Sequence, residues 1–204
     1  LLAGAGLAVW LAGGAPPRAA LPVPVPAPAQ AVPAPFDPLT ALEQVANGAQ
    51  PDRAIIVTAQ QSQVRIGKDR FQFAVHASRD GYLYVQMVGS DRNNFYLLFP
   101  NAVDKDNRIK AGQTVTLPRT GWRMGVEGPA GVDQFVAIVS DAPRSFDSAG
   151  LVQGDLFAEF PVARAGALQR AYRGATPLFA GTPTCTAPCS AAYGASRFAI
   201  EEVN

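Results

Sequence analysis

Histidine and cysteine are scarce in this sequence, which has one histidine, His76, and two cysteines among its 204 residues. A zinc centre made of these residue types needs about four ligands, so the three residues available are too few. A Ser-His-acid triad would depend on His76 alone, and the sequence has no Gly-x-Ser-x-Gly elbow to pair with it. It also has no Walker loop and no Gly-x-Gly-x-x-Gly motif. We therefore predict no catalytic residue, no metal site and no bound cofactor.

Charge is also sparse, since charged residues make up 16% of the chain and the formal net charge is +1. A basic stripe that attracts nucleic acid, or an acidic tail, is therefore not indicated. Hydrophobic residues make up 48%, while 18 prolines and 19 glycines favour β-structure, loops and linkers over a helical bundle. We expect one globular domain with appended segments and no nucleic-acid partner.

The first segment, residues 1–14, reads LLAGAGLAVWLAGG and carries no charged side chain. As a helix it would be about 21 Å long, which is less than the ~30 Å hydrocarbon core of a bilayer. Three interpretations are open: the outer end of a transmembrane helix, the core of a signal peptide, or a buried helix. The first is our working hypothesis, and it makes this segment a membrane anchor.

Residues 15–36 form a Pro/Ala-rich linker with eight prolines. Because proline fixes φ and lacks an N–H, the linker can form neither a helix nor a central strand. In extended polyproline II conformation it would be roughly 60 Å long. It is either a semi-rigid spacer that lifts a domain off a membrane or a disordered linker between domains. A PxxP ligand for a signalling domain is a weaker alternative.

Residues 37–204 are predicted to form a single domain with its core at 54–146. The domain should begin with a short helix, because Asp37 is a natural N-cap, Pro38 suits the first helical position and Gly48 suits the end. From Ala54 to Ser140 the hydrophobic period becomes two, which indicates strands. 

Two of these strands lie in residues 70–77 and 80–88, and the second segment begins with the dipeptide Asp80-Gly81. This dipeptide predicts a tight turn that joins them as a hairpin. In the first strand, Phe73 and Val75 face one way, while His76 faces the other way, as a surface or half-buried strand residue would.

Short strands at fairly even spacing predict a mainly β fold, namely an antiparallel immunoglobulin-like β-sandwich. The short helix precedes the sandwich, and a small helical and loop-rich extension follows it. No cysteine pair brackets a core tryptophan, as it would in a true immunoglobulin domain. A closing strand near the C-terminus should add to the sandwich, with Phe198 and Ile200 pointing inward. The expected core residues are Phe73, Val75, Leu83, Val85, Leu98, Val115, Val136 and Ile138.

Cys185 and Cys189 are separated by three residues, one more than in a Cys-x-x-Cys redox centre. Two thiols without a nearby histidine make a poor metal site. In an oxidising compartment beyond a membrane they would form a disulfide. The bond would close a small loop before the last strand and contribute roughly 2 kcal/mol. Free thiols are the alternative.

Aromatic residues on neighbouring strands suggest a recognition surface. Tyr82 and Tyr84 share one face, and tyrosine offers both an apolar ring and a polar hydroxyl group to a partner. Tyr96 on the next strand, with Asn101 and Arg108 in the connection that follows, completes this candidate binding surface. The alternative is that the N-terminal helix or the C-terminal extension covers this face.

The connection at residues 101–112, NAVDKDNRIKAG, has some features of a calcium loop. Asp104 and Asp106 fit positions 1 and 3, but Arg108 occupies position 5 and Ile109 replaces the glycine at position 6. We therefore interpret the segment as a charge-balanced link between strands, with Ile109 pointing inward. A looser calcium site in a β-loop is the alternative.

Taken together, several segments resemble the bacterial "domain of unknown function 4384" over about residues 54–146. The matching segments are RDGYLY (79–84), LFPN (98–101), NRIKAG (107–112), GPAG (128–131) and VAIVS (136–140). The resemblance implies an extracytoplasmic module of a larger bacterial protein. Hosts of this family include membrane-anchored serine/threonine kinases, some of them similar to regulators of type VI secretion. The family has no established catalytic residues, so none is transferred.

The order of segments here, an apolar stretch, a proline-rich spacer and then this domain, resembles those kinases, whose catalytic domain would precede Leu1. We therefore predict a non-catalytic periplasmic sensory module that binds a small ligand or an envelope protein. It would be anchored to the inner membrane by its N-terminal segment. The alternative is a structural or assembly component of a cell-envelope or secretion complex.

Overall fold

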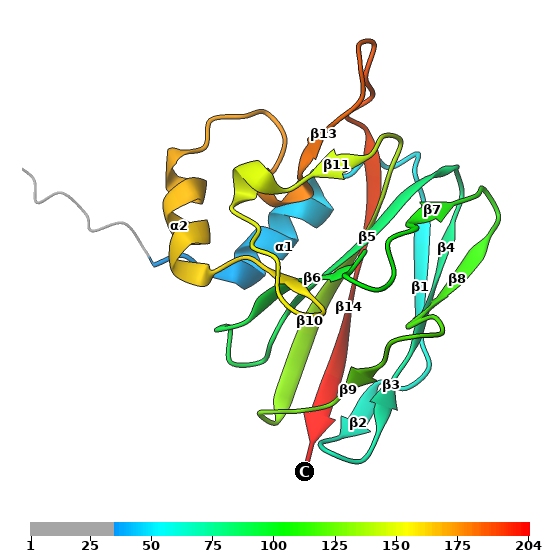
Figure 1. Cartoon of the computed structure of the whole chain (residues 1–204), viewed down its shortest axis with the longest axis vertical. Coiled ribbons are helices and arrows are strands. Elements are labelled where there is room, and N and C mark those ends of the chain that lie inside the picture. Colours follow the sequence, from blue (N-terminus) through cyan, green and yellow to red (C-terminus); the bar gives the residue numbers. More distant parts are fainter. Residues whose placement is uncertain (1–34) are drawn as a thin grey trace, which may run out of the picture. The chain divides into compact units, whose positions relative to one another are not determined.

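The computed structural model describes residues 35–204 of the chain (Figure 1). The predicted membrane anchor at residues 1–14, and all but the last two residues of the Pro/Ala-rich linker, lie outside the described residues. Across residues 35–204, the structure contains no helix with the length and hydropathy that a membrane span requires.

The domain is mainly β, with two α-helices, two 3₁₀ turns and several open sheets. In chain order the elements are α1 (Pro38–Asn47), β1 (Ile55–Ala59), β2 (Gln63–Arg65), β3 (Arg70–Phe71), β4 (Phe73–Ala77), β5 (Gly81–Val88), β6 (Phe95–Phe99), β7 (Arg108–Ile109), β8 (Thr114–Leu117), β9 (Met124–Gly125), β10 (Gly131–Ser140), β11 (Arg144–Ser145), η1 (Asp147–Ala149), β12 (Ala158–Glu159), α2 (Val162–Ala171), η2 (Leu178–Ala180), β13 (Thr182–Pro183) and β14 (Tyr193–Val203).

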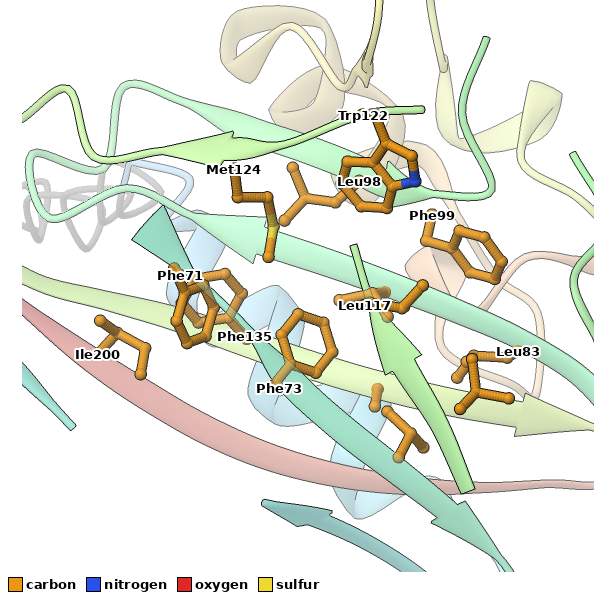
Figure 2. Packing of buried hydrophobic residues seen from close by; sticks show 14 of the residues in the cluster. Phe71, Phe73, Leu83, Leu98, Phe99, Leu117, Trp122, Met124, Phe135 and Ile200 are labelled. Atoms are coloured by element: carbon orange, nitrogen blue, oxygen red, sulfur yellow. The ribbon is translucent and has the colours of Figure 1, made fainter. Parts of the chain in front are cut away.

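The large sheet has the strand order β12-β6-β5-β10-β14-β2, with β7 paired to β5, and the small sheet has the order β1-β4-β8. The two sheets enclose the first hydrophobic core, to which β4 contributes Phe73 and β10 contributes Phe135. A two-stranded ribbon of β3 and β9 closes one end of this core with Phe71 and Met124. Figure 2 shows these aromatic and aliphatic side chains packed together.

The opposite face of the large sheet carries a second core, beneath α1 and the C-terminal extension. Tyr84 and Val136 from the sheet meet Leu42 of α1 and Phe179 of η2 there. The helices and the small sheet accordingly lie on opposite sides of the large sheet (Figure 1). All eight residues expected in the core are buried, but Val136 and Ile138 belong to this second core and the other six to the first.

Helix α1 has the predicted boundaries. The Asp37 side chain accepts a hydrogen bond from the Leu39 N–H at 3.0 Å, and Pro38 occupies the first helical position. Gly48 ends the helix with φ −83°, so the glycine is not required there for a left-handed conformation. It is required by close packing, because a Cβ at this position would lie 2.6 Å from the Tyr193 hydroxyl oxygen.

The hairpin predicted at Asp80-Gly81 is wrong. Strand β4 pairs with β1 and β8 in the small sheet, whereas β5 pairs with β10, β6 and β7 in the large sheet. The Asp80 carboxylate accepts hydrogen bonds from the Ala111 N–H at 2.8 Å and from Lys110 Nζ at 2.9 Å. These contacts fix a turn in which the chain crosses from one sheet to the other.

The described strand pairs are antiparallel except for β2, which runs parallel to β14. The closing strand β14 pairs with β10 over ten residues, from Tyr193 to Glu202, and Phe198 and Ile200 pack into the first core as predicted. The disulfide between Cys185 and Cys189 is present. It lies in the connection from β13 to β14, which projects from the domain at the top of Figure 1.

Arg144 joins the C-terminal extension to the large sheet. It is buried, and its guanidinium donates hydrogen bonds to the Ser140 hydroxyl oxygen and to the carbonyl oxygens of Ala180, Gly181 and Ala191. The same group lies 4.8 Å from the centroid of the Tyr193 ring. Burial lowers the pKa of Arg144 from its ordinary value, although nearby Tyr193 and Tyr84 oppose this change.

We predict that Arg144→Lys lowers the free energy of unfolding by about 3 kcal/mol. Lysine has a single ammonium group that cannot reach several carbonyl groups in a planar arrangement, and it leaves buried acceptors without donors. Urea denaturation followed by circular dichroism would measure the change. Arg70→Lys, at an exposed position, is the control and should change stability by less than about 0.5 kcal/mol. Equal stability of the two variants would contradict this role of Arg144.

Candidate functional site

A cavity of about 340 Å³ lies at the end of the first core, between the large sheet and the β3–β9 ribbon. Its apolar walls include Phe71, Met87, Met124, Phe135 and Ile200. Four of these residues, all except Met87, are labelled in Figure 2, where they gather at one end of the core. The volume is within the range of small-molecule sites, which begins at about 300 Å³.

Two loops form the rim of this cavity. The β5–β6 loop contributes Gly89, Ser90, Asp91 and Asn94, and the β9–β10 loop contributes residues 127–129. Both loops come from the same end of the large sheet, because β5 and β10 are antiparallel neighbours with Val88 opposite Gln134.

Two carboxyl groups, those of Asp133 on β10 and Glu202 on β14, line the cavity below the rim. Their residues are only 5% and 8% exposed. Because Gly131 lies opposite Glu202 and Asp133 lies opposite Ile200, the two carboxyl groups are diagonal neighbours on the inward face of the sheet. Each accepts a hydrogen bond from the rim: Asp133 Oδ1 from the Ser90 N–H at 2.9 Å, and Glu202 Oε2 from the Gly128 N–H at 2.8 Å.

Burial, together with hydrogen bonding to Glu202 and charge repulsion from Glu202, raises the pKa of Asp133 to about 7, while the Ser90 N–H opposes the change. Below this pH range Asp133 therefore keeps its proton, which its carboxyl group can donate to Glu202. We call Asp133 and Glu202 together the carboxyl pair.

The remaining charged residues that line the cavity are Asp91, Glu127 and Arg123. Including the carboxyl pair, four acidic side chains and one basic side chain therefore surround an apolar interior. Among the described residues, no ion pair joins Arg123 to any of these acidic groups. The site combines apolar walls with a small number of hydrogen-bonding groups at the entrance, an arrangement typical of ligand pockets.

The candidate binding surface predicted from the sequence does not exist as one surface. Tyr84 is only 4% exposed, and its hydroxyl oxygen accepts a hydrogen bond from the Arg144 N–H at 2.7 Å. The layer made by α1 and the C-terminal extension covers it, which is the alternative considered above. Tyr82 and Arg108 do lie together on paired strands, with the guanidinium 6.0 Å from the ring centroid.

Asn101 and Tyr96, the other two predicted surface residues, lie elsewhere. The Asn101 side chain is buried, donates to the Leu98 carbonyl oxygen at 3.1 Å and accepts from the Asp104 N–H at 2.9 Å, so it shapes a turn. Tyr96 lines the cavity, and its hydroxyl group is 3.2 Å from Asn94 Oδ1. Of the five residues, Tyr96 alone reaches the site that the structure reveals.

The segment with calcium-loop features has a structural role. Asp104 accepts hydrogen bonds from the Arg119 guanidinium and from Trp122 Nε1, the latter at 2.9 Å. Ile109 is buried in the first core, as predicted. Within residues 35–204 there is no cluster of three or more histidine, cysteine or acidic side chains that could hold a metal ion.

The carboxyl pair was missed in the sequence, although a signal was present. In β10 the inward positions 135, 137 and 139 are apolar, and Asp133 continues the same alternation. In β14 Glu202 follows Ile200 two residues later, again on the inward side. Two acidic residues on the apolar face of predicted strands indicate buried carboxyl groups, whose burial costs free energy unless they are paired or hydrogen-bonded.

Comparison with known families gives one match. Residues 63–143 match the model of a family described as a domain of unknown function, DUF4384. This confirms the resemblance seen in the sequence, and the matched residues run from β2 to just beyond β10. They include Asp133 and both rim loops of the cavity but not Glu202. No match is found among the curated proteins.

We predict that the carboxyl pair makes the domain less stable as pH rises from about 4 to about 7. Over this range the folded state keeps a proton on Asp133 that the unfolded state, with the ordinary value of 3.8, has lost. Above about pH 7 both states are ionised and the stability curve should level off. Urea denaturation at pH 5 and pH 8 should show a loss on the order of 2 kcal/mol.

The matched variant is Asp133→Asn, which keeps an acceptor for Ser90 and a donor for Glu202 without an ionisable group. It should be more stable than the wild type at pH 8 and should show little of this pH dependence. Glu201→Gln, on the exposed side of the same strand, controls for the loss of one surface charge. Parallel pH profiles for the wild type and Asp133→Asn would contradict the assignment.

Proposed function

The chain carries a DUF4384 domain at residues 63–143, and we propose that it is a non-catalytic sensory module that binds a small ligand in the cavity above the carboxyl pair. The observation that carries the proposal is the cavity itself, about 340 Å³ in volume and bounded by Phe71, Met87 and Phe135. Protein interiors are otherwise close-packed, so an apolar hollow of this size is an exception within the domain. Its apolar walls and the two acids beside it are suited to binding a small molecule.

Binding is favoured over catalysis by the position of the one histidine. His76 lies on β4 of the small sheet, with Nδ1 3.3 Å from Thr114 Oγ1, and it does not line the cavity. The residues around the cavity include no cysteine, lysine or histidine. The carboxyl pair supplies hydrogen bonds and charge, but its oxygens also hold the rim in place.

We place the domain on the periplasmic side of the bacterial inner membrane. The Cys185–Cys189 disulfide supports this location, because such bonds persist in oxidising compartments. The resemblance to membrane-anchored kinases supports a role in signalling, and we propose a host that regulates type VI secretion, with the proline-rich linker between anchor and sensor. We also propose that the facing sheets form an immunoglobulin-like sandwich, which the largely antiparallel pairing supports.

A structural or assembly role in an envelope complex is the second candidate. It is favoured by the exposed disulfide loop between β13 and β14, which projects from the domain. A partner docked there would contact a surface that is stiffened by the bond and does not line the cavity. Such binding would be unaffected by changes to the cavity.

Ligand binding can be tested with N-phenyl-1-naphthylamine, a neutral apolar probe that fluoresces when it leaves water. We predict saturable binding to the wild type and at least tenfold weaker binding to Met87→Trp, because the larger side chain fills the cavity. Ile56→Trp adds the same side chain at a position that is 60% exposed and outside the cavity, and it should bind as the wild type does. No saturable binding by the wild type, or equal binding by Met87→Trp, would overturn the proposed function.

A further inference from the structure

The rim of the cavity is tied to the large sheet by the carboxyl pair. The Ser90 N–H donates to Asp133, and the Gly128 N–H donates to Glu202. The two loops are also joined to each other, because the Ser90 hydroxyl group donates to the Pro129 carbonyl oxygen at 3.0 Å. The carboxyl pair thus anchors one backbone amide of each loop to the large sheet.

The loops also fit closely against each other. Gly131 has φ 148°, and a Cβ built there would lie 2.7 Å from the Ser90 Cβ atom. Ser90 and the start of β10 therefore pack closely, and a displacement of Ser90 would change this contact. The strands beneath are more firmly held, because β10 pairs with β14 over ten residues and with β5 over seven. If the carboxyl groups move apart, the loops have more freedom to follow them than the strands have.

The charges that face the carboxyl pair do not stabilise two ionised groups. The β5–β6 loop presents Asp91, which raises the pKa of Asp133, and the β9–β10 loop presents Glu127. Arg123, directly before β9, lines the cavity without forming an ion pair to either acid among the described residues, and Tyr96 of β6 is neutral. On β14, the neighbouring Glu201 faces outward and is exposed.

We propose that the carboxyl pair is a proton-controlled latch, in which loss of the shared proton separates the two carboxyl groups and opens the rim of the cavity. The inference rests on the proposed function, since it concerns access to the same site. With the proton present, one carboxyl group donates to the other and both loops are held. Without it, two negative charges repel each other in a mostly apolar wall, where little water screens them. The raised pKa of Asp133, about 7, places the transition near neutral pH.

Opening of the rim can be measured without a ligand by amide hydrogen exchange of Ser90 and Gly128, followed by NMR from pH 6 to pH 8. After correction for the intrinsic pH dependence of exchange, protection of both amides in the wild type should fall at least tenfold. Asp133→Asn should keep its protection over the whole range, because the amide donates to Glu202 at any pH. Glu201→Gln should behave as the wild type does.

Glu202→Gln is a second neutral variant, for use if Asp133→Asn folds poorly, and urea denaturation would establish that each variant is folded. Equal, pH-independent protection in the wild type and in either neutral variant would overturn the latch. An equal fall in all of them would overturn it as well, because the change would then not depend on the carboxyl pair.

Probe entry separates this inference from the proposed function. The association rate of N-phenyl-1-naphthylamine, measured by stopped flow, should rise at least threefold from pH 6 to pH 8 in the wild type and stay constant in Asp133→Asn. A rate that is independent of pH in the wild type overturns the latch, while the binding itself supports the proposed function. Absence of probe binding at any pH overturns the proposed function, and the exchange measurement then decides the latch alone.

Discussion

The structure depends on burial of both faces of the large sheet. Residues of β10 at 135, 137 and 139 pack into the first core, and those at 136 and 138 pack into the second core. From Phe135 to Ser140 both faces of this strand are closed to water, because the small sheet covers one face and the helical layer covers the other. The same constraint makes Asp133 unusual, since it occupies a position where every following inward residue is apolar.

Strand positions could be predicted from the sequence, because alternation along a strand records which side chains face an apolar surface. Strand partners could not be predicted, because alternation is the same whether the next strand lies alongside or in the opposite sheet. Asp80-Gly81 illustrates this limit, since its contacts with the distant residues Lys110 and Ala111 decide where the chain goes. Tyr84 illustrates a second limit of prediction. A tyrosine suited to recognition at a surface is equally suited to a hydrogen bond inside the protein.

The cavity and the meeting of its two acids could not be predicted from the sequence, for a related reason. Its two acids are 69 positions apart in the chain and become neighbours only through the pairing of β10 with β14. Alternation along each strand indicates that each acid faces inward, but it does not indicate that the two acids meet. The cavity they border depends on how completely Phe71, Met124 and Ile200 fill the space between sheet and ribbon. Filling of this kind depends on three-dimensional packing, which hydrophobic periodicity does not describe.

The pairing of β14 with β10 also determines which segments of the chain a folded fragment must contain. The family match ends at residue 143, yet the strand that completes the central sheet begins at Tyr193, and the helix that covers it ends at Asn47. A fragment cut at the limits of the match would keep β4 and β8 over one face of β10. It would lose the helical layer over the other face, the partner strand β14 and one of the two acids. The matched segment is thus smaller than the folded domain, whose elements run from Pro38 to Val203.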